Sequence, residues 1–148
     1  MGVSAYVPVL FVACMSCQTA NVSRAMDVTA GSFRISAQLA KCEYKRVVGV
    51  EYTFVHGNVS VENRGSGPET FELDALRLSF DGNVSKGAEV DSVAHFLPSV
   101  VINPATAVHK DVYWVFDGRV PLPKLNEVKL HYARTPPVQS DPQPPRRE

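Results

Sequence analysis

The chain has no excess of charge of either sign. Its 148 residues include fifteen Lys and Arg against fifteen Asp and Glu, so the formal net charge is zero. A nucleic-acid-binding protein neutralises phosphates with a basic surface, and attraction to anionic lipids needs a polybasic cluster. The composition therefore argues against a nucleic-acid partner and against a purely electrostatic membrane contact.

The N-terminal 23 residues carry no charged side chain, and the first one in the chain is Arg24. The apolar run within this segment, residues 7–13, is shorter than the stretch of about 20 residues that crosses a bilayer. Its length is that of the hydrophobic region of a signal peptide, and the small residue Ala13 precedes a candidate cleavage position. We therefore predict a signal peptide over residues 1–13 and export from the cytoplasm.

The sequence Phe-Val-Ala-Cys at residues 11–14 resembles a bacterial lipobox, in which a small residue precedes the cysteine that is lipidated. The resemblance implies a lipoprotein that begins at Cys14, is held in the bacterial cell envelope by its lipid and has residues 14–26 as a polar tether. Three alternatives stay open: processing at Cys17, ordinary secretion or release into the periplasm, and an uncleaved first strand in a cytosolic protein. Of the three Asn-Val-Ser sequons, at Asn21, Asn58 and Asn83, those at Asn21 and Asn83 would be glycosylation sites under secretion from a eukaryotic cell.

Cysteine is scarce, which excludes a disulfide-rich scaffold, since only Cys14, Cys17 and Cys42 are present. With Cys14 acylated, Cys17 and Cys42 are candidates for one disulfide, whose loop of about 25 residues would contribute roughly 3 kcal/mol. In the alternative, Cys42 is simply a small apolar core residue.

Helical periodicity is also lacking, whereas alternation with a period of two runs from residue 27 onward. The predicted strands are residues 33–39, 44–61, 71–80, 107–116 and 126–132, with an irregular stretch over residues 85–98. Changes of parity predict a bulge near His56-Gly57 and a second bulge or corner near Asp74-Ala75.

Divided at these two changes of parity, the five ranges make about seven strands separated by turn signals. This pattern predicts an all-β domain over residues 27–134, a single immunoglobulin-like β-sandwich, with a flattened barrel as the alternative. Residues 135–148 hold five of the eleven prolines and are predicted to form a disordered tail.

Three segments carry a resemblance to a known class of domain. Residues 59–65 (Val-Ser-Val-Glu-Asn-Arg-Gly), 71–73 (Phe-Glu-Leu) and 112–116 (Val-Tyr-Trp-Val-Phe) are similar to immunoglobulin-like domains of bacterial envelope lipoproteins. The resemblance implies a fold and an envelope setting, and it carries over no functional residue.

Motifs for metal binding and catalysis are missing. The four histidines, His56, His95, His109 and His131, show no metal-ligand spacing, although pairing of their strands would bring His109 and His131 together on an outward face. We therefore expect no metal and no cofactor.

Catalytic side chains have simpler interpretations. Ser66 lies between two glycines in a turn, and Glu72 and Asp74 alternate with apolar residues as on a solvated strand. We predict no catalytic activity; the alternative is a periplasmic metal-handling or hydrolytic domain.

Aromatic residues of the 107–116 strand divide between two faces. The parity places Trp114 in the core, and it places Tyr113 and Val115 on the opposite face, where they are a candidate patch for an envelope protein or a glycan. The sequence therefore predicts a lipid-anchored binding or structural module. The alternative is an accessory subunit of an envelope assembly that docks through its proline-rich tail.

Overall fold

The computed structural model describes residues 18–90 and 99–134, and over these residues the fold is all-β, as predicted. Ten strands, one 3₁₀ turn and one four-residue helix follow one another along the described chain. All strand pairs are antiparallel. The predicted signal peptide and the proline-rich tail lie outside the described residues.

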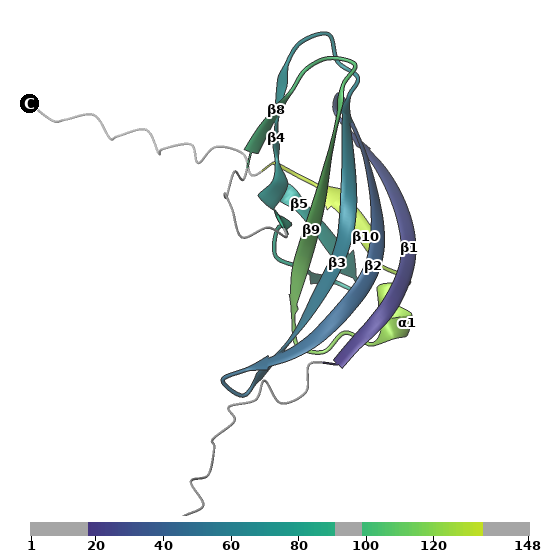
Figure 1. The fold of residues 1–148 in the computed structure, drawn as a ribbon, viewed down its shortest axis with the longest axis vertical. Coiled ribbons are helices and arrows are strands. Elements are labelled where there is room, and N and C mark those ends of the chain that lie inside the picture. The colour runs from purple at the N-terminus through teal and green to yellow at the C-terminus, as the bar shows by residue number, and fades with distance from the viewer. Residues whose placement is uncertain (1–17, 91–98, 135–148) are drawn as a thin grey trace, which may run out of the picture.

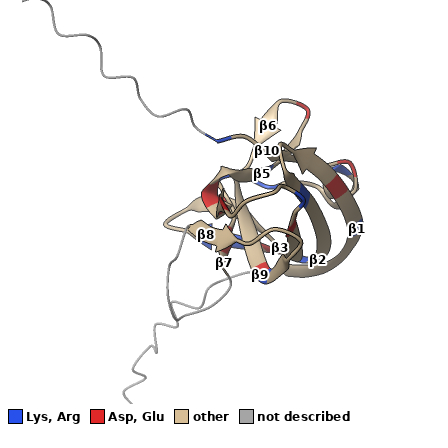
Figure 2. Ribbon diagram, turned by 90° about the horizontal axis from the view of Figure 1, so that it is seen from above, with Lys and Arg blue, Asp and Glu red and all other residues tan. Residues whose placement is uncertain are grey.

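The largest sheet has five strands and is strongly curved (Figure 1). Its strands, in spatial order, are β1 (Gln18–Ala30), β2 (Phe33–Val47), β3 (Val50–Asn63), β9 (Ala107–Asp117) and β7 (Glu89–Val90). Seen from above, β1, β2, β3 and β9 follow an arc, and β5, β8 and β10 lie across its concave side (Figure 2). The core therefore sits inside the arc.

Two small sheets cover that concave side. One has the order β10 (Lys129–Tyr132), β5 (Leu76–Phe80) and β6 (Asn83–Val84), and the other pairs β4 (Glu69–Glu72) with β8 (Ser99–Ile102). The 3₁₀ turn η1 (Leu73–Ala75) joins β4 to β5, which confirms the predicted corner near Asp74-Ala75. The short helix α1 (Leu122–Leu125) leads from β9 toward β10.

Trp114 is fully buried between the sheets, as its parity predicted. Its indole Nε1 donates a hydrogen bond of 3.1 Å to the carbonyl oxygen of Leu76, so the one polar atom of the ring is satisfied. The backbone N–H groups of Ser85 and Ala88 donate to β5, while that of Lys86 donates 2.9 Å to Val115 of β9. This segment therefore ties the large sheet to the three-stranded sheet along one edge.

The domain begins earlier than the sequence indicated. Residues 18–26, assigned to the predicted tether, form most of β1, so this part of the tether prediction is wrong. Val22 and Met26 are buried in the core, whereas the polar residues Asn21 and Ser23 are exposed on the other face of the strand. The polar residues of this segment form the solvent-exposed face of an edge strand, and their composition is similar to that of a flexible tether.

The predicted continuous strand from Tyr44 to Phe54 is wrong, because a tight hairpin interrupts it. Val47 pairs with Val50, which leaves only Val48 and Gly49 in the turn, at φ angles of 49° and 79°. Positive φ at both positions defines a type I′ turn, whose twist matches the flanking strands. Valine is a poor residue for that geometry, so the sequence carried no turn signal there.

The bulge predicted near His56-Gly57 lies in the neighbouring strand instead. β3 keeps one phase throughout, whereas the β2–β3 register shifts between Leu39 and Lys41, opposite His56 and Gly57. A Cβ on Gly57 would lie 2.4 Å from the carbonyl oxygen of Gln38. Gly57 is therefore the residue that lets the bulged backbone approach closely.

Asn63 organises the loops at the opposite end of the sheet from the Val48-Gly49 turn. Its side chain is fully buried. Its Nδ2 donates to the carbonyl oxygens of Gly67 (2.9 Å) and Ile102 (2.8 Å), and its Oδ1 accepts from the N–H of Gly65 at 2.8 Å. One side chain therefore holds two loops together.

Candidate functional site

The outer face of the five-stranded sheet carries four half-buried rings, which we call the outer aromatic cluster: Tyr52, Phe54, His56 and Tyr113. The strand register places His56 beside Tyr113 and Phe54 beside Val115. The Tyr113 ring centroid lies 6.0 Å from that of Phe54 and 5.9 Å from that of His56. Tyr113 therefore contacts the Phe54 and His56 rings across β3 and β9, and Tyr52 lies on the same face of β3.

Charged side chains of β2 border one side of the cluster. The Glu43 carboxylate lies 3.3 Å from Lys41 Nζ, 3.1 Å from Lys45 Nζ and 3.5 Å from His56 Nε2. Burial by itself would raise the pKa of Glu43, but the ammonium groups of Lys45 and Lys41, together with His56, bring the net pKa below its usual value. Lys45 Nζ also lies 4.4 Å from the centroid of the Phe54 ring.

The other side of the cluster is bordered by β7 and the segment before it. The Tyr113 hydroxyl donates a hydrogen bond to the Glu89 carboxylate, and Lys86 Nζ lies 5.9 Å from the Tyr52 ring centroid. Charges of both signs therefore flank the rings on both sides, and these contacts hold the Glu43, Tyr113 and Glu89 side chains in place.

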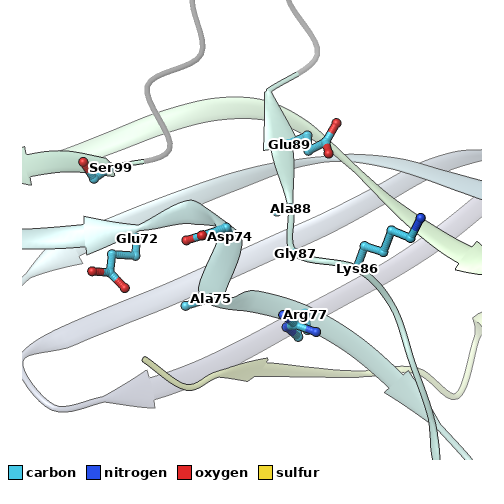
Figure 3. A pocket seen from close by; sticks show the side chains of 9 residues that line it. All are labelled: Glu72, Asp74, Ala75, Arg77, Lys86, Gly87, Ala88, Glu89 and Ser99. Atoms are coloured by element: carbon cyan, nitrogen blue, oxygen red, sulfur yellow. The ribbon is translucent and has the colours of Figure 1, made fainter. Parts of the chain in front are cut away.

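A groove of about 450 Å³ lies next to this edge, between η1, the Lys86–Glu89 segment and the start of β8 (Figure 3). Its charged lining residues are Glu72, Asp74, Arg77, Lys86 and Glu89. A Cβ on Gly87 would lie 2.0 Å from the carbonyl oxygen of Asp74, so only glycine allows this close approach. Glu89 points away from Glu72 and Asp74, so the three carboxylates do not converge (Figure 3).

No family model, curated protein or solved structure matches the chain. The interpretation of its surfaces therefore depends on their geometry and chemistry.

The histidines considered as metal ligands are not brought together. His109 pairs with Ser60 in the five-stranded sheet, whereas His131 lies in the three-stranded sheet, where its Nε2 forms a short contact with Ser79 Oγ. Within the described residues, no group of three or more His, Cys, Asp or Glu side chains has the geometry of a metal site. His95 lies outside them, and Ser66 is exposed in a turn.

The cysteine predictions concern residues that the structure describes only in part. Cys42 is a fully buried free thiol opposite Ala20 of β1, whereas Cys14 and Cys17 lie outside the described residues. The described parts of the chain contain no helix that is long and apolar enough to cross a bilayer.

Tyr113 and Val115 lie on the face opposite Trp114, as the parity predicted, and both are half-buried. The sequence did not place Tyr52, Phe54 or His56 beside them, because it does not show which strand pairs with β9 or in which register. The alternation of Lys41, Glu43 and Lys45 in β2 was a signal for this face, since such residues mark the solvent side of a strand.

Proposed function

We propose that the protein is a lipoprotein of the bacterial cell envelope, anchored through Cys14, whose β domain binds a partner protein through the outer aromatic cluster. The predicted likeness to immunoglobulin-like domains of envelope lipoproteins is part of this proposal. The observation that carries it is the outer aromatic cluster itself, in which four half-buried rings with flanking charges lie beside Val115 on a sheet face whose other residues are mostly polar.

Two physical properties make this surface suitable for binding. Aromatic side chains are enriched at protein interfaces because they offer a large contact area at a small cost in conformational entropy. The contacts of Tyr113 with Phe54, His56 and Glu89 order the rings in advance, which lowers the entropy lost on binding.

The ring geometry favours a protein over a glycan. The Tyr113 ring is tilted by 34° to Phe54 and by 40° to His56, so the cluster offers no single flat platform on which a sugar ring would stack. Lys41, Lys45 and Glu89 place both signs of charge at the rim, as is typical of protein interfaces.

The proposal includes no catalytic step. The groove of Figure 3 has carboxylates from Glu72, Asp74 and Glu89, but the paired-carboxylate chemistry of glycoside hydrolysis needs two such groups on either side of one bond, and Glu89 points away from the other two.

The test compares affinity capture from native envelopes with the wild type and two variants, Tyr113→Ala and His109→Ala. Both positions lie on the outward face of β9, and His109 is exposed away from the cluster, so it is the matched control. We expect Tyr113→Ala to lose its partner protein and His109→Ala to retain it, with folding of each checked by its melting temperature.

A folded Tyr113→Ala variant that retains the partner would refute the proposed site. Capture of a glycan instead of a protein, detected by analysis of its sugar composition, would show that the proposed partner is not a protein. The mass of the mature N-terminus tests the anchor separately.

A further inference from the structure

Three exposed valines form the end of the β2–β3 hairpin, which we call the valine tip: Val47, Val48 and Val50. Their exposed fractions are 50%, 98% and 50%. The tip lies at the lower end of the sheet in Figure 1, where the hairpin extends beyond the neighbouring strands. It is an apolar projection of a surface that is otherwise mostly polar.

Val48 is costly to the fold in its present conformation. A β-branched residue at a φ of 49° is a genuine outlier, and Asn-Gly is the usual sequence for a type I′ turn. The side chain is almost fully exposed, so it gains nothing from packing within the chain. A strained residue with no internal contact points to a contact outside the domain.

The chain enters the domain at this same end. Gln18, the first residue of β1, pairs with Tyr44, three residues before Val47, and Arg119 Nη2 donates to Gln18 Oε1 at 2.8 Å. Cys14 precedes Gln18 by four residues, which span at most about 14 Å even when fully extended. Because β1 begins at Gln18 and not after a tether that ends at residue 26, Cys14, the proposed anchor, lies within about 14 Å of the end of the sheet that carries the valine tip.

The two ends of the sheet differ in polarity. Leu122 of α1 is 39% exposed and lies with Gln18, Tyr44 and Arg119 around a shallow pocket, at the end where the chain enters. The opposite end consists of polar loops, residues 63–67 and 103–106, held by Asn63. Four of the six large apolar side chains that are exposed among the described residues, Val47, Val48, Val50 and Leu122, therefore lie at the end where the chain enters; the other two are Val84 and Val101.

We propose that the valine tip, together with Leu122, inserts into the head-group region of the bilayer that holds the lipid of Cys14. This inference rests on the proposed lipid anchor and adds an orientation to it, because a chain-end anchor alone leaves the domain free to rotate. A second apolar contact strengthens membrane binding and fixes the sheet upright. Arg46 beside the tip has its side chain 59% exposed and forms an ion pair of 3.6 Å with Glu51, so its charge is already paired and the proposed contact rests on the apolar side chains.

The experiment uses the full mature chain, purified with its lipid and reconstituted into phosphatidylethanolamine–phosphatidylglycerol vesicles. An environment-sensitive fluorophore is attached to a cysteine introduced by Val48→Cys, in a Cys17→Ser background; Cys42 is fully buried and protected from labelling. The matched control has the label at Ser66→Cys, in the exposed turn at the opposite end. The N-terminal mass of each sample reports the lipid on Cys14.

We expect the label at position 48 to shift its emission to the blue in vesicles and to be quenched by head-group spin labels, while the label at position 66 does neither. If the lipid is present but the label at position 48 stays in water, the inference is overturned and the anchor stands. If the mass shows no lipid on Cys14, the anchor is refuted, and the inferred membrane contact is refuted with it. The N-terminal mass therefore distinguishes this outcome from a failure of the tip contact alone, which the fluorescence reports. A label shielded without vesicles, in a dimeric sample, would assign the tip to a second copy and overturn the inference.

Discussion

The substitution Val48→Asn should stabilise the isolated protein. A residue held at an unfavourable positive φ costs of order 1–3 kcal/mol, and asparagine tolerates that conformation far better than valine. No packing is lost, because 98% of the Val48 surface is exposed. We expect the free energy of unfolding to rise by about 1 kcal/mol, which for a domain of this size raises Tm by roughly 4 °C.

Thermal and urea unfolding, followed by the fluorescence of the buried Trp114, measure this change. Val101→Asn is the matched control, because Val101 is 63% exposed but is not among the residues with positive φ. That variant should be neutral or slightly destabilised, since asparagine is a poor strand residue. A Tm for Val48→Asn equal to or below that of the wild type would refute the argument from strain.

Three further substitutions test the fold. Asn63→Asp replaces an amide donor that faces the carbonyl oxygens of Gly67 and Ile102, so it should cost about 3 kcal/mol at pH 7, and the exposed Asn21→Asp should cost little. These carbonyls raise the pKa of the new carboxyl, so the loss in free energy of unfolding should become smaller as the pH falls and the neutral acid donates a hydrogen bond again. A loss that does not change with pH would contradict this reasoning. Gly57→Ala should cost about 2 kcal/mol because its Cβ meets Gln38, whereas Gly67→Ala, with nothing within 4 Å, should be close to neutral in urea unfolding. Burial, with the neighbouring Cys42, raises the pKa of Tyr44 to about 12, above the ordinary value of 10, and its hydroxyl donates 2.7 Å to the Val120 carbonyl. The stability from Tyr44 should therefore be complete below pH 10 and be lost as the pH rises toward 12, so the advantage of the wild type over Tyr44→Phe, about 1 kcal/mol at pH 7, should disappear in alkaline unfolding curves.

The sequence predicted the elements in which local pattern and tertiary packing agree. The alternation around Trp114 gave both faces of β9, and the change of parity near Asp74-Ala75 marked the η1 corner. The prediction failed at Val48-Gly49, because a turn with β-branched valine at positive φ violates local preference. It also placed a bulge in β3, because the outward-facing Tyr52 and Phe54 are apolar and gave the appearance of a change in parity, whereas β3 keeps one phase and the extra residue lies in β2.

The candidate site was predictable only in part for the same reason. Tyr113 and Val115 follow from the parity of β9 alone, whereas Phe54 and His56 join them only through the β3–β9 register. Glu89 reaches Tyr113 from a two-residue strand that no periodicity reveals. Long-range pairing therefore built most of the cluster.

The length of the strands fixes the distance between the two ends of the large sheet. Gln18 lies at the end with the valine tip, whereas Arg134, the last described residue, donates to the Thr70 carbonyl of β4, close to the end organised by Asn63. β3 has 14 residues, and at about 3.3 Å per residue its length is roughly 45 Å along the curve. Under the proposed contact between the valine tip and a bilayer, Arg134 would lie about the length of one strand away from the lipid, and the domain would act as a spacer of that height.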